Sequence, residues 1–456
     1  MNAEKENVNP LGYAPLGGLI AKFAIPAIIS MLVSSLYNIV DQIFIGWGVG
    51  MLGNAATNIA FPISIFCTSL SLLLGIGAAS NYNINSGAGE VKKAEHYAGN
   101  GLSMLCISGV TYMVIVLIFL RPLLNIFGVT AEILPYALSY TGITAFGIPF
   151  VIVSVGGNHI IRADRSPTYS MVSVLSGAVL NTILDPIFIF VFGMGISGAA
   201  IATVISQILS GLMVLIYFIK YKKMNLDKDA LTPNAFYLKG IVSVGMASCI
   251  NQLAIGAVQI AMNNTLKHYG AVSVYGSDIP IACAGIISKI NMVFMAICIG
   301  ISQGCQPIFG FNFGAKKYDR VIGTYKRAFI LTLTIGTVFF ICFQLFPRQI
   351  VGIFGQGSDI YFEFAVKYIR IFLFLTFANG LHPMSSNFYT SMGKAKLGAI
   401  VSLTRQILFL LPMILIFPVF FGIEGVMYAG PIADAIALVI ALMFAYREIK
   451  IMKTAV

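Results

Sequence analysis

Charged residues are scarce in this sequence of 456 residues, in which Asp, Glu, Lys and Arg together make up only 10%. A soluble globular domain carries about 25%, so the composition excludes one. The net charge of +11 would suit nucleic-acid binding, but the Lys and Arg residues lie in short clusters between apolar runs, which is typical of membrane topology. With 58% hydrophobic residues and a mean hydropathy of +0.89, the chain is predicted to be a polytopic membrane protein without a nucleic-acid partner.

The sequence also lacks the motifs of several other classes of protein. All seven cysteines fall inside apolar segments, without a CxxC pair or a histidine at ligand spacing, so we expect neither a disulfide framework nor a metal cluster. Because no Walker A sequence is present, ATP is not the expected energy source. No nucleophile–base set is visible within the apolar runs, so we predict neither an enzyme nor a bound cofactor.

Twelve apolar runs are long enough to cross a bilayer. They cover residues 19–46, 55–83, 98–120, 133–155, 168–192, 196–219, 238–266, 279–305, 327–346, 361–383, 397–419 and 423–446. The N-terminus lacks a small-residue cleavage pattern, so we expect the first run to stay in the mature protein. If both termini are cytoplasmic, most Lys and Arg residues fall on the cytoplasmic side, as the positive-inside rule requires. We therefore expect a multi-pass protein of the plasma membrane with cytoplasmic termini.

The two halves of the chain repeat each other. The stretch GIGAASNYNINSGAGEVKK, from Gly75, aligns with GISQGCQPIFGFNFGAKK, from Gly300. Because six runs separate equivalent points, both copies cross the membrane in the same direction and are related by an axis along its normal. We predict an all-α fold of twelve transmembrane helices in two six-helix lobes, residues 1–219 and 238–456, joined by a cytoplasmic linker at 220–237.

The first run carries one acidic residue, Asp41, at a position where a carboxylate facing lipid would cost about 2.5–3.5 kcal/mol. Reading back from it in steps of three and four gives Asn38, Tyr37 and Ser34 on one helical face. Such a face requires a wet or protein-lined partner, and a functional role for the acid is favoured. The alternative is that Asp41 lies in the last helical turn and merely solvates that end.

The fifth run carries the second acid, Asp185, four residues after Asn181 on the same stripe. The alternative here is that Asp185–Pro186 is a turn or a kink. In the sixth run Thr203 and Gln207 share one side. If the runs of one lobe form a bundle, the two acids can converge with Asn181 and Thr203. Two adjacent carboxylates in a low dielectric cannot both stay ionised and unpaired, so the pair binds a proton or a hard cation such as Na⁺.

The C-terminal half does not copy this arrangement. Its first run has no acid where Asp41 would be and offers amides instead, among them Gln252 and Gln259. It carries membrane-embedded charge of its own in Lys289, Arg405 and Asp434. Either basic residue can meet a substrate anion, but pairing with Asp434 or reaching the interface is the favoured role. We therefore expect the coupling site in the N-terminal lobe.

Four motifs together resemble the multidrug and toxic compound extrusion (MATE) family, in its bacterial MepA-like and DinF-like branch. They are PAIISMLVSSLYNIVDQIFIG, NTILDPIF, GISGAAIATVISQ and GFNFGAKKYDR. The resemblance implies V-shaped lobes and efflux of bulky, often cationic drugs in exchange for H⁺ or Na⁺. It also implies a cation site at Asp41, Asn181, Asp185 and Thr203, with Tyr140 nearby and Tyr37 and Asn158 as pocket candidates. This chain departs from members that carry further acids in the seventh and tenth spans, because Asn263 or Asn264 stands near the first position and the nearest tenth-span acid, Glu363, lies at the outer end.

We therefore predict a monomeric multidrug antiporter that works by alternating access in the lipid bilayer, with Pro26 allowing the first span to bend. Its pocket candidates are Tyr37, Asn158, Ser34, Gln207, Gln252, Gln259, Lys289 and Arg405. The alternative is a flippase of lipid-linked saccharides with the same two-lobe layout, which would need a broad basic groove within the membrane. The sequence does not identify the substrate or distinguish Na⁺ from H⁺.

Overall fold

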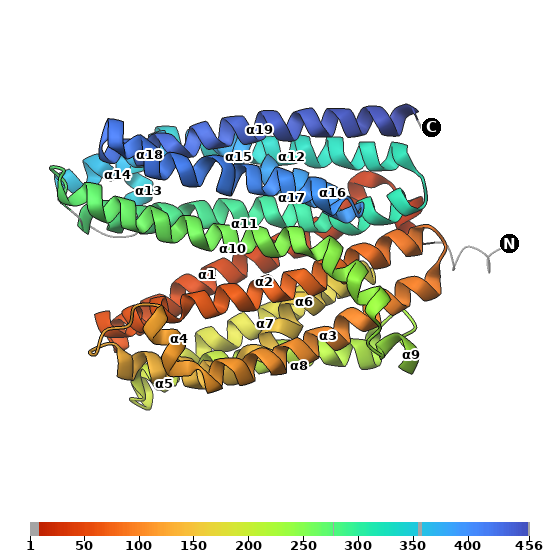
Figure 1. Cartoon of the computed structure of the whole chain (residues 1–456), viewed down its shortest axis with the longest axis horizontal. Coiled ribbons are helices and arrows are strands. Elements are labelled where there is room, and N and C mark those ends of the chain that lie inside the picture. Colours follow the sequence, from red (N-terminus) through yellow and green to blue (C-terminus); the bar gives the residue numbers. More distant parts are fainter. Residues whose placement is uncertain (1–8, 277, 354–357, 455–456) are drawn as a thin grey trace.

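The computed structural model describes residues 9–276, 278–353 and 358–454, and these are helical without a strand. The helices form two elongated bundles that lie side by side (Figure 1). Most of the N-terminal half of the chain lies in one bundle and most of the C-terminal half in the other, but the start of the first long helix packs into the core of the second bundle. Both ends of the described chain lie at the same end of the molecule. We call this end the closed end, because the lobes are in contact there, and we call the opposite end, where they separate, the open end.

The first bundle contains the long helices that carry the two acids. Its helices are α1 Leu16–Gly48, α2 Met51–Gly87, α3 Val91–Ile118, α4 Leu120–Ile126, α5 Leu134–Thr144, α6 Ile148–Ala163, α7 Pro167–Pro186 and α8 Gly195–Ile216. Short turns η1 Pro10–Gly12 and η2 Ala145–Gly147 precede α1 and α6, and π-helical turns η3 Ile187–Val191 and η4 Tyr217–Tyr221 extend α7 and α8. The linker forms the single turn α9 Lys228–Leu231.

The second bundle repeats this order with more breaks. Its helices are α10 Ala235–Ala271, α11 Asp278–Gly314, α12 Tyr318–Leu345, α13 Pro347–Gly352, α14 Asp359–Phe372, α15 Thr376–Asn379, α16 Leu381–Ser391, α17 Ala395–Leu403, the π-helical η5 Thr404–Leu410, α18 Leu411–Phe421 and α19 Ile423–Thr454.

The prediction of an all-helical, two-lobe membrane protein is confirmed. In the described part of the chain, 11 helices are long and apolar enough to cross a membrane. The remaining predicted run, 361–383, is divided among α14, α15 and α16. The hydroxyl of Thr376 donates to the carbonyl of Leu373 at 2.5 Å and supports the first break. The twelve-segment layout therefore holds, with the tenth segment built from short helices.

The lobes meet through two equivalent helix pairs. Helix α1 packs along α11, and α10 packs along α2. Glycines permit these close crossings: a Cβ added at Gly300 would lie 2.6 Å from the Cα of Ile28, and one at Gly245 would lie 1.8 Å from the carbonyl oxygen of Leu73. Small residues let transmembrane helices approach this closely. The repeat seen in the sequence is thus also a repeat of the contacts between the lobes.

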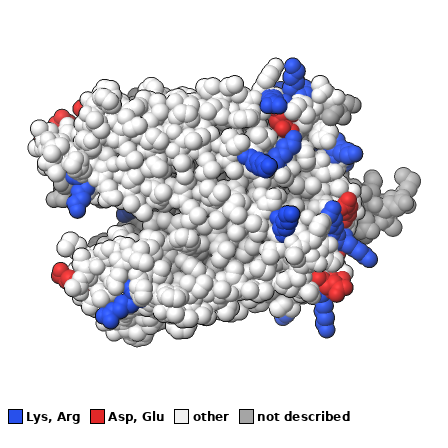
Figure 2. Space-filling model, in the orientation of Figure 1, with Lys and Arg blue, Asp and Glu red and all other residues white. Residues whose placement is uncertain are grey.

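A polar network crosses from one lobe to the other at the closed end. Arg162 of α6 is buried, and its Nη2 donates to Oε1 of Gln303 on α11 at 3.1 Å. Nearby, Nε2 of Gln306 donates to Oγ of Ser80 on α2 at 3.2 Å. Figure 2 shows that the lobes separate toward the other end, where a hollow opens between them. Most of the basic side chains visible in that view lie at the closed end, and fewer lie at the open end (Figure 2).

Candidate functional site

The two acids predicted from the sequence lie together between α1 and α7. The Asp185 side chain is fully buried, and its carboxyl group lies beside that of Asp41 where α1 packs on α7. Two carboxyl groups at this separation share a proton or bind a cation, because two bare negative charges repel strongly in a low dielectric. The arrangement therefore has the chemistry of a site that binds one positive charge.

Asn181 connects this pair to α8. Its Nδ2 donates to Oδ1 of Asp185 at 3.2 Å and to Oγ1 of Thr203 at 3.5 Å. The amide orientation leaves Oδ1 of Asn181 facing away from both partners. The structure thus brings together all four residues of the predicted cation site: Asp41, Asn181, Asp185 and Thr203.

Three oxygen atoms of this cluster are buried and accept no hydrogen bond from the described residues. They are Oδ1 of Asp41, Oδ1 of Asn181 and Oδ2 of Asp185. Oxygen ligands of this kind fit a hard cation such as Na⁺, and the carboxyl pair alone fits H⁺. Among the described residues no group of three or more His, Cys, Asp and Glu side chains could hold a metal ion.

The local backbone removes the alternative raised for Asp41, and for Asp185–Pro186 it removes the turn but not the kink. Helix α1 continues to Gly48, so Asp41 does not lie in its last turn. Helix α7 includes Asp185 and Pro186 and passes directly into the π-helical η3, so Asp185–Pro186 is not a turn that ends the helix. Proline cannot donate a backbone hydrogen bond, and a π-helical turn is a common way to accommodate such a gap.

Two tyrosines surround the carboxyl pair. Tyr37 on α1 and Tyr140 on α5 both lie close enough to interact electrostatically with Asp41 and Asp185. Tyr140 also packs against Ile45 in a small apolar cluster. Aromatic bodies at this position exclude water, while their hydroxyl groups offer donors to a carboxylate. Both residues are thus placed to tune the cation site.

The other N-terminal candidates share no side-chain hydrogen bond with this cluster among the described residues. Asn158 is buried between α6 and α7, where it donates to the carbonyl of Ser154 and accepts from Oγ of Ser173 at 3.0 Å. The Gln207 side chain packs against Gly147, since a Cβ added at Gly147 would lie only 1.9 Å from Oε1 of Gln207. Ser34 is half-buried on α1. Their assignment to a substrate pocket stays a prediction.

The C-terminal candidates do not join the N-terminal site. Nε of Arg405 donates to Oδ1 of Asp434 at 2.5 Å, and both side chains are buried. Arg405 is thus paired with Asp434, which is the role that the sequence favoured over binding a substrate anion. Gln259 donates to Oδ1 of Asn263 at 3.1 Å. Gln252 and Lys289 are half-buried, and no ion pair of the described residues includes Lys289.

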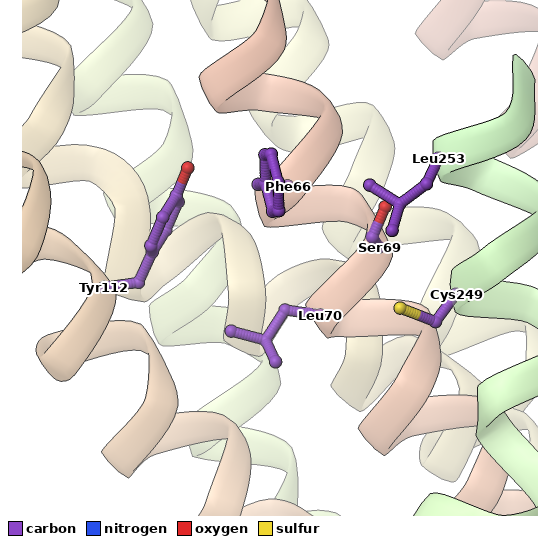
Figure 3. Close-up of a pocket in the computed structure, with 6 residues that line it drawn as sticks. All are labelled: Phe66, Ser69, Leu70, Tyr112, Cys249 and Leu253. Carbon is purple, nitrogen blue, oxygen red and sulfur yellow. The ribbon is translucent and has the colours of Figure 1, made fainter. Parts of the chain in front are cut away.

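A small cavity lies between α2, α3 and α10, away from both groups of candidates. Its volume is about 120 Å³, and it is lined by Phe66, Ser69, Leu70, Tyr112, Cys249 and Leu253 (Figure 3). Its lining is almost entirely apolar. Because it is small and lacks a charged wall, it adds nothing to the cation site.

Sequence reasoning missed the polar network at the closed end. It counted Arg162 only as one of the basic residues outside the apolar runs, although this side chain is buried between the lobes. A signal was available in GISQGCQ, where two glutamines stand in a membrane-spanning run. Buried amides in a membrane require hydrogen-bond partners, and Gln303 finds one in Arg162.

Comparisons with known proteins agree with this architecture. The profile of the MatE family matches residues 26–187 and 248–416. The multidrug export protein MepA of Staphylococcus aureus (strain MSSA476) is 26% identical over 437 residues, covering 95% of this chain and 94% of that protein. MepA of Staphylococcus saprophyticus is 24% identical over 428 residues, covering 93% and 92%.

Solved structures share the fold. The outward-facing conformation of a multidrug resistance MATE family transporter of the MOP superfamily superposes with a TM-score of 0.89 at 23% identity and covers 96% of each chain. A crystal structure of MATE in the straight conformation gives a TM-score of 0.90 at 23% identity and covers 98% of each chain. Because the family profile spans most of the sequence, this chain belongs to the MatE family, as its motifs predicted.

Proposed function

We propose that this protein exports bulky, often cationic organic compounds across the plasma membrane in exchange for H⁺ or Na⁺. The observation that carries the proposal is the carboxyl pair of Asp41 and Asp185, which is withdrawn from lipid and joined to α8 through Asn181. Its relatives named above include multidrug export proteins. A lobe that binds and releases one positive charge can couple transport to an ion gradient, since one charge crossing 100 mV is worth about 2.3 kcal/mol.

The proposed cycle begins with a cation that enters from the open end. Its binding neutralises the Asp41–Asp185 pair and removes the electrostatic cost of closing apolar helices over it. Helix α1 contains Pro26, which lacks a backbone donor, so α1 can bend as this packing changes. Bending of α1 narrows or reshapes the N-terminal lobe and releases the exported compound outward. The return step releases the cation on the other side.

The charge distribution supports an orientation for this cycle. Most of the visible basic side chains lie at the end that holds both chain termini (Figure 2). By the positive-inside rule this end faces the cytoplasm. The hollow then faces outward, and the contact between Arg162 and Gln303 closes the cytoplasmic side. We expect the protein to act as a monomer, since each chain holds its own cation site.

A flippase of lipid-linked saccharides remains the alternative, and the membrane-embedded charges give it less support. Binding a diphosphate within the membrane requires several converging cations. Arg405 is instead paired with Asp434. Lys289 alone does not make a broad basic groove.

The proposal is tested with purified protein in vesicles loaded with ethidium, on which a Na⁺ gradient and a pH gradient are imposed separately. We expect ethidium efflux to be driven by one of the two gradients, which identifies the coupling ion. Vesicles without protein provide the background rate. Folded protein that moves no ethidium under either gradient but flips a fluorescent lipid-linked sugar would contradict the proposal and support the alternative.

A further inference from the structure

One side of α11 is packed against α1 near the closed end and becomes exposed toward the open end. In the closed half, Cβ atoms added at Gly304 and Gly300 would lie 2.5 Å and 2.6 Å from backbone atoms of α1. Ala296, one turn further toward the open end, is still only 4% exposed. Met292 on the next turn is 43% exposed, and a Cβ added at Gly285 would meet no atom within 4 Å. This side of α11 is therefore sealed at the closed end and exposed at the open end, where Figure 2 shows the hollow between the lobes.

Lys289 lies on this side of α11. It precedes Gly300 by close to three full turns of an α-helix, so both residues share the same face. Gly300 contacts α1, and the face that carries Lys289 therefore points toward the N-terminal lobe. The Lys289 side chain is half-buried rather than fully solvated. Its place on this face directs the side chain toward the space between the lobes.

No acidic side chain of the described residues forms an ion pair with Lys289. Asp434, which the sequence offered as its partner, is bound by Arg405 at 2.5 Å. Glu424 is paired with Lys367. Asp41 and Asp185 lie inside the N-terminal lobe and are held against each other. A partly dehydrated ammonium group gains most from an ionised acceptor, because charge-assisted hydrogen bonds are stronger than neutral ones.

The surroundings of Lys289 suit a compound with an apolar body. Met292, three residues after Lys289 on α11, is an exposed apolar side chain on the same side of the helix. We propose that Lys289 binds the carboxylate or sulfonate group of amphipathic organic anions, which makes such anions part of what this protein exports. The inference rests on the proposed export function and assigns a substrate class to its outward hollow. Charge on this side of α11 disfavours cations, so cationic compounds gain their binding elsewhere.

The test measures binding of two dyes of opposite charge to the purified full-length chain in lipid nanodiscs, by fluorescence anisotropy. We expect the anion carboxyfluorescein to bind the native chain, and Lys289→Gln to weaken this binding about tenfold, which corresponds to about 1.4 kcal/mol. The same substitution removes a like charge from the path of the cation ethidium and should strengthen its binding about threefold. Lys289→Arg keeps the charge and should retain anion binding.

Lys267→Gln is the matched control, because Lys267 is exposed at the outer end of α10 and the substitution removes the same charge. We expect it to change neither dissociation constant. Failure of the native chain to bind carboxyfluorescein would overturn the proposal. Equal weakening of both dyes by Lys289→Gln would also overturn it, since a structural role acts on both charges alike. Binding needs no gradient, so a failure of antiport in the ethidium experiment is a separate result.

Discussion

The guanidinium group of Arg162 on α6 joins three helices, because Nη2 donates to Oε1 of Gln303 on α11 at 3.1 Å and Nη1 donates to Oγ of Ser170 on α7 at 3.0 Å. Ser170 shares a buried stripe of α7 with Ser173, Asn181 and Asp185. The helix that carries the proposed cation site is therefore hydrogen-bonded to a residue that joins the lobes at the closed end. A movement of α7 on cation binding can reach the closed end through this one side chain.

Removal of this side chain should loosen the closed end. A hydrogen bond to a charged group is worth about 1.5–3 kcal/mol, so Arg162→Ala should raise the open fraction about tenfold or more. The reporter is a cysteine placed at Asn83, which is buried against Gly310 of α11, in a chain whose natural cysteines are replaced by serine. We expect faster labelling of this cysteine by a soluble thiol reagent. Unchanged labelling would show that Arg162 does not hold the lobes together.

Loss of one partner of the Arg405–Asp434 pair should lower the stability of the protein far more than loss of both partners. Asp434→Ala leaves a buried guanidinium uncompensated, which costs about 3–5 kcal/mol of stability. Replacement of both residues by Met and Leu removes both charges and should recover most of this loss. Thermal unfolding in detergent measures the comparison. Equal melting temperatures for the single and double variants would contradict a buried ion pair.

Asp164, between α6 and α7, should make stability depend on pH. Its carboxylate accepts from the Tyr217 hydroxyl at 2.7 Å and from the backbone of Lys223 at 2.6 Å, yet burial outweighs these bonds and raises its pKa above the ordinary value of 3.8. A raised acid pKa means that the folded state holds its proton longer, so stability falls as pH rises from about 4 through the folded pKa.

The variant Asp164→Asn stays neutral at every pH and can still accept both hydrogen bonds. We therefore expect the melting temperature of Asp164→Asn, relative to the native chain, to rise as the pH is raised above about 4. Melting curves at several pH values give this difference. Asp229→Asn, at an exposed position in the linker turn α9, is the control and should show no such trend. A constant difference between Asp164→Asn and the native chain would contradict the raised pKa.

Much of the fold could be predicted because a membrane-spanning helix must be long enough to cross the bilayer and mostly apolar, and both properties can be read from the sequence. The break in the tenth segment could not, since it depends on local contacts such as that of Thr376 with the carbonyl of Leu373. The stripe of α7 was readable from its spacing, because Asn181 and Asp185 are one turn apart on one helix. Their meeting with Asp41 needed the packing of α1 on α7, which no single-helix pattern contains.

The closed end shows the opposite case. Arg162 lies at a helix end, where positive charge is expected in the cytoplasm whatever its partner. Its burial follows only from the approach of the second lobe, which places Gln303 against it. Whether Arg405 or Lys289 pairs with Asp434 likewise depends on which of them lies close to this acid in the folded chain. Only the folded chain places Arg405 against Asp434.

The account depends most on the Asp41–Asp185 pair as the coupling site, and gradient-driven ethidium efflux from vesicles by Asp41→Asn tests it most directly. We expect this efflux to fall at least about tenfold, toward the rate of empty vesicles, because an amide cannot take up and release a positive charge. Asp229→Asn makes the same chemical change on the surface and should keep the native rate. Native efflux by Asp41→Asn under the driving gradient would contradict the account.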